Sequence, residues 1–205
     1  DARIGTLIDA GKNFKSLDVY TSAECIGKNQ EFVRDGFEWD TWEKNMFRLH
    51  DSENIRSVHI MMTISALSIW SIAEFMNKII DWRKKFVNKE EFFMSVNILR
   101  FPSFQSINII SQDVKNKLAD EIEETLNKNK QYMIGWEENQ FQRVIEYLRK
   151  VDTSYEDTDT FENKHHDFKN FVEQYAIRRE MSIEDYMPEE FQEWFKTLKT
   201  IESNG

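Results

Sequence analysis

Residues 58–65 read VHIMMTIS and are almost continuously apolar. A strand with one solvated face alternates apolar and polar side chains, so this run predicts a strand that is buried on both faces. Strands of that kind occur in parallel sheets that helices cover from both sides. The run therefore favours an α/β fold.

Two further strand-like runs and three helical segments surround this run. Residues 17–22 (LDVYTS) predict a short strand, and residues 92–106 (FFMSVNILRFPSFQS) begin as an apolar strand and end in a polar, basic turn. Helical spacing of apolar residues occurs in residues 4–14, from Asp40 onward, and in residues 69–86. Residues 23–36 predict a loop or a short irregular helix, and Asp40 with Glu43 has capping-box spacing. The alternation predicts right-handed βαβ units.

The second half of the sequence predicts helices alone. We expect them over residues 111–130, 137–150 and 159–179, and Pro188 is expected to open a last helix. Residues 152–159 are acidic and polar, which is typical of a linker or a mobile loop. Residues 1–110 therefore form the predicted α/β segment, and residues 111–205 form a helical extension.

The last helix carries Phe191, Trp194 and Phe195 at helical spacing. Aromatic residues in that pattern usually pack into a core. If the same face stayed exposed, it would instead be a contact surface for another protein. Both interpretations are kept at this point.

Charge and cysteine content exclude several classes of function. The formal net charge of the 205 residues is −10 and the densest basic cluster is Arg83-Lys84-Lys85, which argues against nucleic-acid backbone binding. Cys25 is the single cysteine, so no intrachain disulfide can form. No apolar span is long enough to cross a membrane and no signal peptide is recognisable. These features predict a soluble, cytoplasmic protein without membrane association.

Polar residues follow each predicted strand at its carboxyl end, where parallel sheets bind ligands. Hydroxyls and an amide suit a ribose or an amino-acid group, and arginine offers a bidentate fork to a carboxylate. As an alternative, the same residues could be turn formers and strand-end caps. His59, within the apolar run, is expected to be a hydrogen-bonded structural imidazole. The candidate ligand-binding residues are Ser22, Arg34, Thr63, Ser65, Asn97 and Arg100, and no catalytic residue can be chosen.

Four segments together resemble one enzyme family. They are YTSAE at residues 20–24, FVRDGFEWDTWEKNM at 32–46, SVNILRFPSFQS at 95–106 and DFKNFVEQYAIRRE at 167–180. Taken together they are similar to the carboxyl-terminal two-thirds of radical S-adenosylmethionine proteins of the twitch type. The resemblance covers most of the chain.

The resemblance implies a partial (β/α) barrel, of which this chain would supply the last three parallel strands. In the family a CxxxCxxC motif holds a [4Fe–4S] cluster that cleaves S-adenosylmethionine to a 5′-deoxyadenosyl radical. By resemblance, Ser22 approaches the cofactor, Arg34 lies near its carboxylate and Ser65 lies near its ribose. Asn97 and Arg100 resemble the residues that border the mouth of the active site.

The sequence departs from the family because it has no CxxxCxxC motif, and Cys25 alone cannot hold a cluster. Either the chain is a fragment that needs an upstream cluster-binding segment of the same protein, or it is a degenerate relative without a cluster. In the first case these residues are inactive alone and face an unidentified substrate, a peptide or a small molecule. Two other readings stay open: a non-catalytic α/β module with a protein-binding helical tail, and an unrelated small-molecule enzyme.

Overall fold

The computed structural model describes residues 2–85, 92–151 and 158–198. Short 3-10 turns lie between some of the elements, namely η1 (Ile69–Ser71), η3 (Ser103–Gln105), η4 (Ile107–Ile109) and η5 (Lys130–Tyr132). The helices and strands, in chain order, are α1 (Ala2–Gly11), β1 (Leu17–Ser22), α2 (Gly27–Val33), α3 (Trp39–His50), β2 (Ile55–Ile64), α4 (Ile72–Lys85), β3 (Phe92–Ile98), α5 (Gln112–Asn129), α6 (Gly135–Arg149), α7 (Thr158–Arg178), α8 (Ile183–Tyr186) and α9 (Glu189–Thr197).

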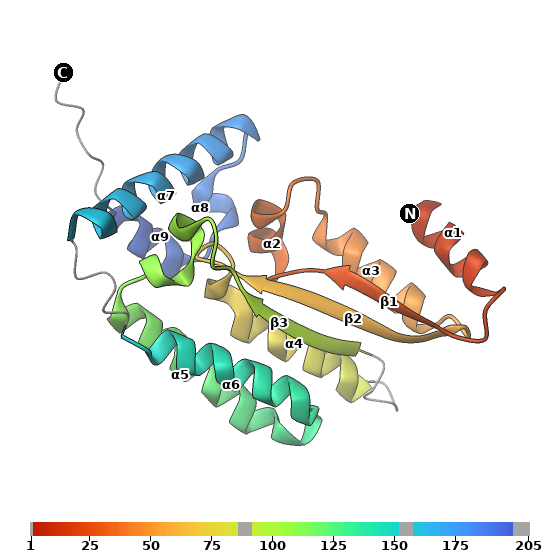
Figure 1. Cartoon of the computed structure of the whole chain (residues 1–205). Helices are drawn as coiled ribbons and strands as arrows, with labels where there is room; N and C mark the ends of the chain where they lie inside the picture. Colours follow the sequence, from red (N-terminus) through yellow and green to blue (C-terminus); the bar gives the residue numbers. More distant parts are fainter. Residues whose placement is uncertain (1, 86–91, 152–157, 199–205) are drawn as a thin grey trace.

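The three strands form one parallel sheet in the order β1-β2-β3 (Figure 1). Tyr20 is in register with His59, and His59 is in register with Phe93. Because all three strands run the same way, their carboxyl ends lie together at one end of the sheet. The predictions of three parallel strands and of a helical second half are confirmed.

Helices cover one face of the sheet. Val58, Ile60 and Met62 of β2 are buried on this face, and α3 and α4 lie over it (Figure 1). The indole nitrogen of Trp42 in α3 donates to the Thr21 hydroxyl of β1 over 3.0 Å. Burial of these apolar side chains is the main source of stability for this layer.

The opposite face of the sheet is partly open. Successive strand residues point to opposite faces, and here His59 and Met61 are half-buried while Thr63 is exposed. Tyr20 of β1 lies on the same face with 64% of its surface exposed. The prediction that β2 is buried on both faces is therefore wrong, because α3 and α4 pack against one side only.

Helix α6 closes the outer edge of β3. The Glu137 carboxylate accepts from the Met94 N–H over 2.7 Å, and the Gln140 side-chain oxygen accepts from the Val96 N–H over 2.6 Å. Side chains thus replace the neighbouring strand that an edge lacks. Among the described residues, no strand pairs with the outer edge of β1.

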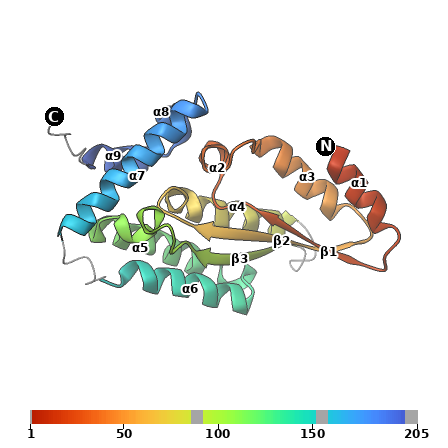
Figure 2. The ribbon, with the colours of Figure 1, turned by 45° about the horizontal axis from the view of Figure 1, so that its top comes forward.

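Helices α7 to α9 gather at the end of the sheet toward which the strands run (Figures 1 and 2). The Tyr175 hydroxyl of α7 donates to the carbonyl of Val33 at the end of α2 over 3.2 Å. Trp194 of α9 packs on Trp70 in η1 with ring centroids 5.2 Å apart. The helical tail therefore lies over the carboxyl ends of the strands.

Some local predictions differ from the structure. Helix α3 begins without a side-chain cap, and the N–H of its first residue, Trp39, donates to Glu31 of α2 over 2.8 Å. The prediction that Asp40 caps this helix is therefore wrong. The short helix α8 is absent from the sequence prediction, and most of the expected linker at 152–159 lies outside the described residues.

Within the described ranges, no helix combines the length and apolar character needed to cross a bilayer.

Candidate functional site

Backbone and side-chain hydrogen bonds tie the carboxyl ends of the three strands together. The Leu99 N–H after β3 donates to the Ile64 carbonyl of β2 over 2.8 Å. The Asn29 amide of α2 donates to the Leu67 carbonyl after β2 over 3.2 Å, and the Ser71 hydroxyl donates to the Asn29 side-chain oxygen over 2.8 Å. These contacts fix the three strand ends relative to one another, so their polar side chains form one rim.

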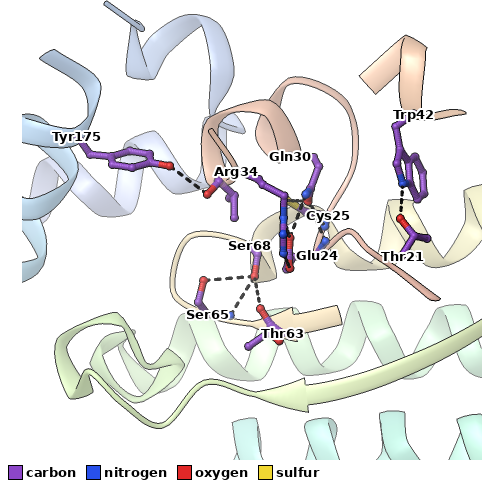
Figure 3. Close-up of polar contacts among 11 residues, drawn as sticks. Thr21, Glu24, Cys25, Gln30, Arg34, Trp42, Thr63, Ser65, Ser68 and Tyr175 are labelled. Atoms are coloured by element: carbon purple, nitrogen blue, oxygen red, sulfur yellow. Dashed lines mark hydrogen bonds and ion pairs between the residues drawn. The ribbon is translucent and has the colours of Figure 1, made fainter. Parts of the chain in front are cut away.

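At the end of β1 the rim holds a buried carboxylate, that of Glu24. Gln30 donates from its amide to Glu24 over 2.9 Å, and Arg34 donates to the other carboxylate oxygen over 2.5 Å (Figure 3). The side chain of Glu24 is 7% exposed, whereas that of Arg34 is 45% exposed. Arg34 therefore neutralises Glu24 with one part of its guanidinium group, and its Nη1 has no hydrogen-bond partner among the described residues.

Two glycines with positive φ shape this segment, one as the first residue of α2 and one in the turn after the helix. Gly27 has φ +58° where α2 begins and Gly36 has φ +69° in the turn that follows the helix. Residues with a Cβ rarely adopt this left-handed region. The two glycines let the chain double back, which brings Gln30 and Arg34 onto Glu24.

Cys25 lies beside this carboxylate and is fully buried. Its backbone N–H and its thiol both point at the side-chain oxygen of Gln30, at 3.0 and 3.4 Å. Burial, with Glu24 adjacent, raises the pKa of the thiol well above its usual range. The side chain is therefore a neutral thiol at pH 7 and a poor metal ligand or nucleophile.

Cys25 is expected to react with a thiol reagent such as DTNB at least about tenfold more slowly in the folded protein than in urea. The thiolate is the reactive form, and burial suppresses both its formation and its access to the reagent. The release of thionitrobenzoate, followed at pH 7.5 with and without 8 M urea as a denaturant, measures the two rates. Equal rates in the two conditions would contradict the burial of this thiol.

At the end of β2 the serines form a turn. The Leu67 N–H donates to the Ser65 hydroxyl over 3.3 Å. The Ser65 N–H donates to the Ser68 hydroxyl over 2.9 Å (Figure 3). Both serines are buried. Ser65 thus shapes the turn out of β2, while Thr63 remains exposed on the open face.

At the end of β3, Asn97 and Arg100 are both exposed. They line a groove of 330 Å³ together with Gln140, Arg143 and Tyr147 of α6. Asn97 is in register with Thr63 and lies on the open face of the sheet. Ser22, half-buried at the end of β1, lies on that face as well.

A row of stacked rings crosses the open face of the sheet. Tyr20 and His59 have ring centroids 4.5 Å apart, and His59 and Phe93 are 4.6 Å apart. Trp136 of α6 continues the row at 6.0 Å from Phe93. The open face therefore presents aromatic rings across the strands and polar side chains at its carboxyl end.

His59 is the hydrogen-bonded imidazole that the sequence predicts. The Ser57 hydroxyl donates to Asp18 over 2.6 Å, so the His59 Nε2–H donates to the Ser57 oxygen over 3.0 Å. Burial lowers the pKa of His59, so the ring is neutral at pH 7. Hydrogen bonds from Arg56 and Ser57 lower the pKa of Asp18 to about 2. This network is structural, because its hydrogen bonds hold the amino-terminal part of β1 on β2.

The structure thus separates the predicted rim residues into two groups. Arg34 and Ser65 are already bonded within the protein. The side chains of the other four, Ser22, Thr63, Asn97 and Arg100, have no hydrogen-bond partners among the described residues. Sequence reasoning missed the residues that complete the rim from other elements: Glu24, Gln30, Gln140, Arg143 and Tyr147. Of these, only Glu24 carried a signal, as a carboxylate two residues after a strand, between Ala23 and Cys25.

Comparisons with protein-family models, with characterised proteins and with solved structures gave no match to this chain. The chemistry of the rim therefore rests on the side chains described above.

Proposed function

We propose that this chain is the carboxyl-terminal part of a radical S-adenosylmethionine enzyme and forms the last three strands of a partial (β/α) barrel. The observation that carries the proposal is the asymmetry of the sheet. Helices cover one face and the β3 edge, whereas the other face is partly open and no described strand pairs with the outer edge of β1. A barrel interior and an edge that joins the preceding strand would have this form.

This function requires a [4Fe–4S] cluster and S-adenosylmethionine, and the described residues suit only the second. A [4Fe–4S] cluster does not fit these residues, because iron–sulfur clusters need several thiolates and Cys25 is single and buried. The cluster ligands would belong to an upstream segment of the same protein. S-adenosylmethionine fits better, because it offers hydroxyl, carboxylate and amino groups to hydroxyl, amide and guanidinium side chains.

The rim residues have distinct roles in this proposal. Ser22 and Asn97 offer hydrogen bonds on the open face, and Arg34, held by Glu24, offers its unpartnered Nη1 to a carboxylate. Ser65 places the β2 terminus near the ribose, and Arg100 borders the mouth. When bound, the cofactor and the cluster supply radical chemistry. The tail helices α7 to α9 exclude water from the carboxyl end of the sheet.

The test uses the protein encoded by the complete reading frame, reconstituted with iron and sulfide without oxygen. After dithionite and S-adenosylmethionine are added, we expect 5′-deoxyadenosine to be detected by mass spectrometry. Asn97→Ala is expected to lower its yield by about fivefold, since one hydrogen bond to a bound group contributes about 1 kcal/mol. Asn127→Ala, at an exposed position on α5, is the matched control and should keep the yield of the unmodified protein.

Two results would overturn the proposal. A complete reading frame that has no CxxxCxxC motif removes the source of the radical. A reconstituted protein that shows the absorbance of a cluster but forms no 5′-deoxyadenosine also contradicts it.

A further inference from the structure

The groove between the carboxyl end of β3 and α6 is built from hydrogen-bond donors. Its polar lining consists of Asn97 and Arg100 from the end of β3 and Gln140, Arg143 and Tyr147 from α6. Apolar side chains of β3 and α6 form the rest of the lining. With a volume of 330 Å³ it is at the small end of ligand pockets. The groove therefore suits a small ligand.

Two of the donors are fixed in position by their other hydrogen bonds. The oxygen of the Gln140 side chain accepts from the Val96 N–H over 2.6 Å, so its amide nitrogen keeps both protons for another partner. The Tyr147 hydroxyl accepts from the Asn108 amide over 2.9 Å, which leaves its own proton to donate. Because these bonds are in place in the protein alone, both donors are preorganised.

The two arginines of the groove have no ion pair and no hydrogen bond with the described residues, although the chain has a net charge of −10. By contrast, Arg149 on the same helix pairs with Asp120 and Glu123, at 2.8 and 2.7 Å. None of the described residues that line the groove carries a carboxylate. The positive charge of Arg100 and Arg143 is therefore uncompensated within the groove, which favours an anion.

We infer that this groove binds the phosphoryl group of a small phosphate monoester. Two guanidinium groups, two amides and a phenol offer more donors than the two oxygens of one carboxylate can use. A phosphoryl group has three acceptor oxygens and nearly two negative charges at pH 7, and it matches the arginine fork. The apolar part of the lining then contacts the organic part of the ligand.

This inference goes beyond the proposed function and does not depend on it, although the groove shares Asn97 and Arg100 with the rim. All the donors belong to the described residues of this chain, so binding is measurable without cluster, S-adenosylmethionine or any upstream segment. The absence of 5′-deoxyadenosine would leave phosphate binding unaffected, and the absence of phosphate binding would leave radical formation unaffected.

The experiment is a calorimetric titration of the full chain with glycerol phosphate at pH 7.5 in a chloride buffer. Single-site binding is expected, and Arg100→Gln and Arg143→Gln should each weaken it by about tenfold or more, since a charge-assisted hydrogen bond contributes about 1.5–3 kcal/mol. Both side chains are exposed and unpaired, so these variants should fold normally, which circular dichroism checks. Acetate is expected to bind at least about tenfold more weakly than glycerol phosphate.

Arg178→Gln is the matched control. Arg178 is exposed on α7 and lies outside the groove, so its substitution removes the same charge and should change the affinity by less than about twofold. An equal loss of affinity in this variant would show unspecific attraction and overturn the inference. Absence of binding to the unmodified chain, or equal affinity for acetate, would overturn it as well.

Discussion

Replacement of Glu137 by alanine is expected to lower the free energy of unfolding by about 3–5 kcal/mol. Glu137 and Arg83 form an ion pair in which both side chains are fully buried, with Nη2 and Oε1 at 2.6 Å and Nη1 and Oε2 at 2.9 Å. Removing the carboxylate leaves a buried guanidinium without its counter-charge. Such a loss is a large fraction of the stability of a typical domain.

The Glu137 carboxylate also connects α6 with α4 and β3. Glu137 accepts from the Met94 N–H of β3 over 2.7 Å, and Arg83 of α4 donates to the Phe92 carbonyl of the same strand over 2.9 Å. The substitution therefore removes the acceptor of a buried strand N–H as well as an ionic partner, and each unsatisfied group has its own cost.

Urea unfolding followed by circular dichroism gives the free energy of unfolding of each variant. Glu138→Ala is the matched control: its side chain is 32% exposed and its pair with Lys130 spans 3.3 Å, so a loss below about 1 kcal/mol is expected. A double-mutant cycle with Arg83→Met isolates the coupling between the two charges. If Glu137→Ala lowered the free energy of unfolding no more than Glu138→Ala does, the buried ion pair would not have this stabilising role.

The order of elements was predictable because it depends on local patterns. Alternating apolar runs and helical spacing identify the strands and the long helices without any knowledge of their neighbours. The coverage of the sheet was not predictable in this way. In the run at 58–65, the side chains of His59, Met61 and Thr63 lie on a face that α3 and α4 do not reach, and only Met61 among them is apolar. Sequence shows what a strand could bury, and packing decides what it does bury.

The rim was predictable only in the residues that the strands themselves contribute. Parallel pairing brings Ser22 and Asn97 to one face, which follows from the direction of the strands. The pair of Arg34 with Glu24 depends on the turn around α2, and the meeting of Arg100 with Arg143 depends on where α6 packs against β3. Both contacts are set by how the elements pack, which the local periodicity of the sequence does not encode.

Replacement of Trp194 by alanine is expected to lower the free energy of unfolding by about 3–5 kcal/mol, as is typical of a large aromatic residue removed from a core. Trp194 is 6% exposed. Its ring centroid lies 5.2 Å from that of Trp70, 5.5 Å from that of Phe168 and 5.9 Å from that of Phe191. The aromatic face of α9 is thus part of the core, as one of the two sequence interpretations predicts.

This prediction also distinguishes the two roles of the tail. Trp136→Ala is the matched control, because Trp136 is 39% exposed and stacks on Phe93 alone among the described rings. This substitution should lower the free energy of unfolding by about 1 kcal/mol. If Trp194→Ala unfolds in urea like the unmodified protein and instead abolishes capture of another protein, the face is a contact surface and the core assignment is wrong. If Trp194→Ala destabilises the protein as expected, α7 to α9 serve to cover the carboxyl ends of the strands. Their aromatic side chains then pack against η1 and against one another and do not form a contact surface.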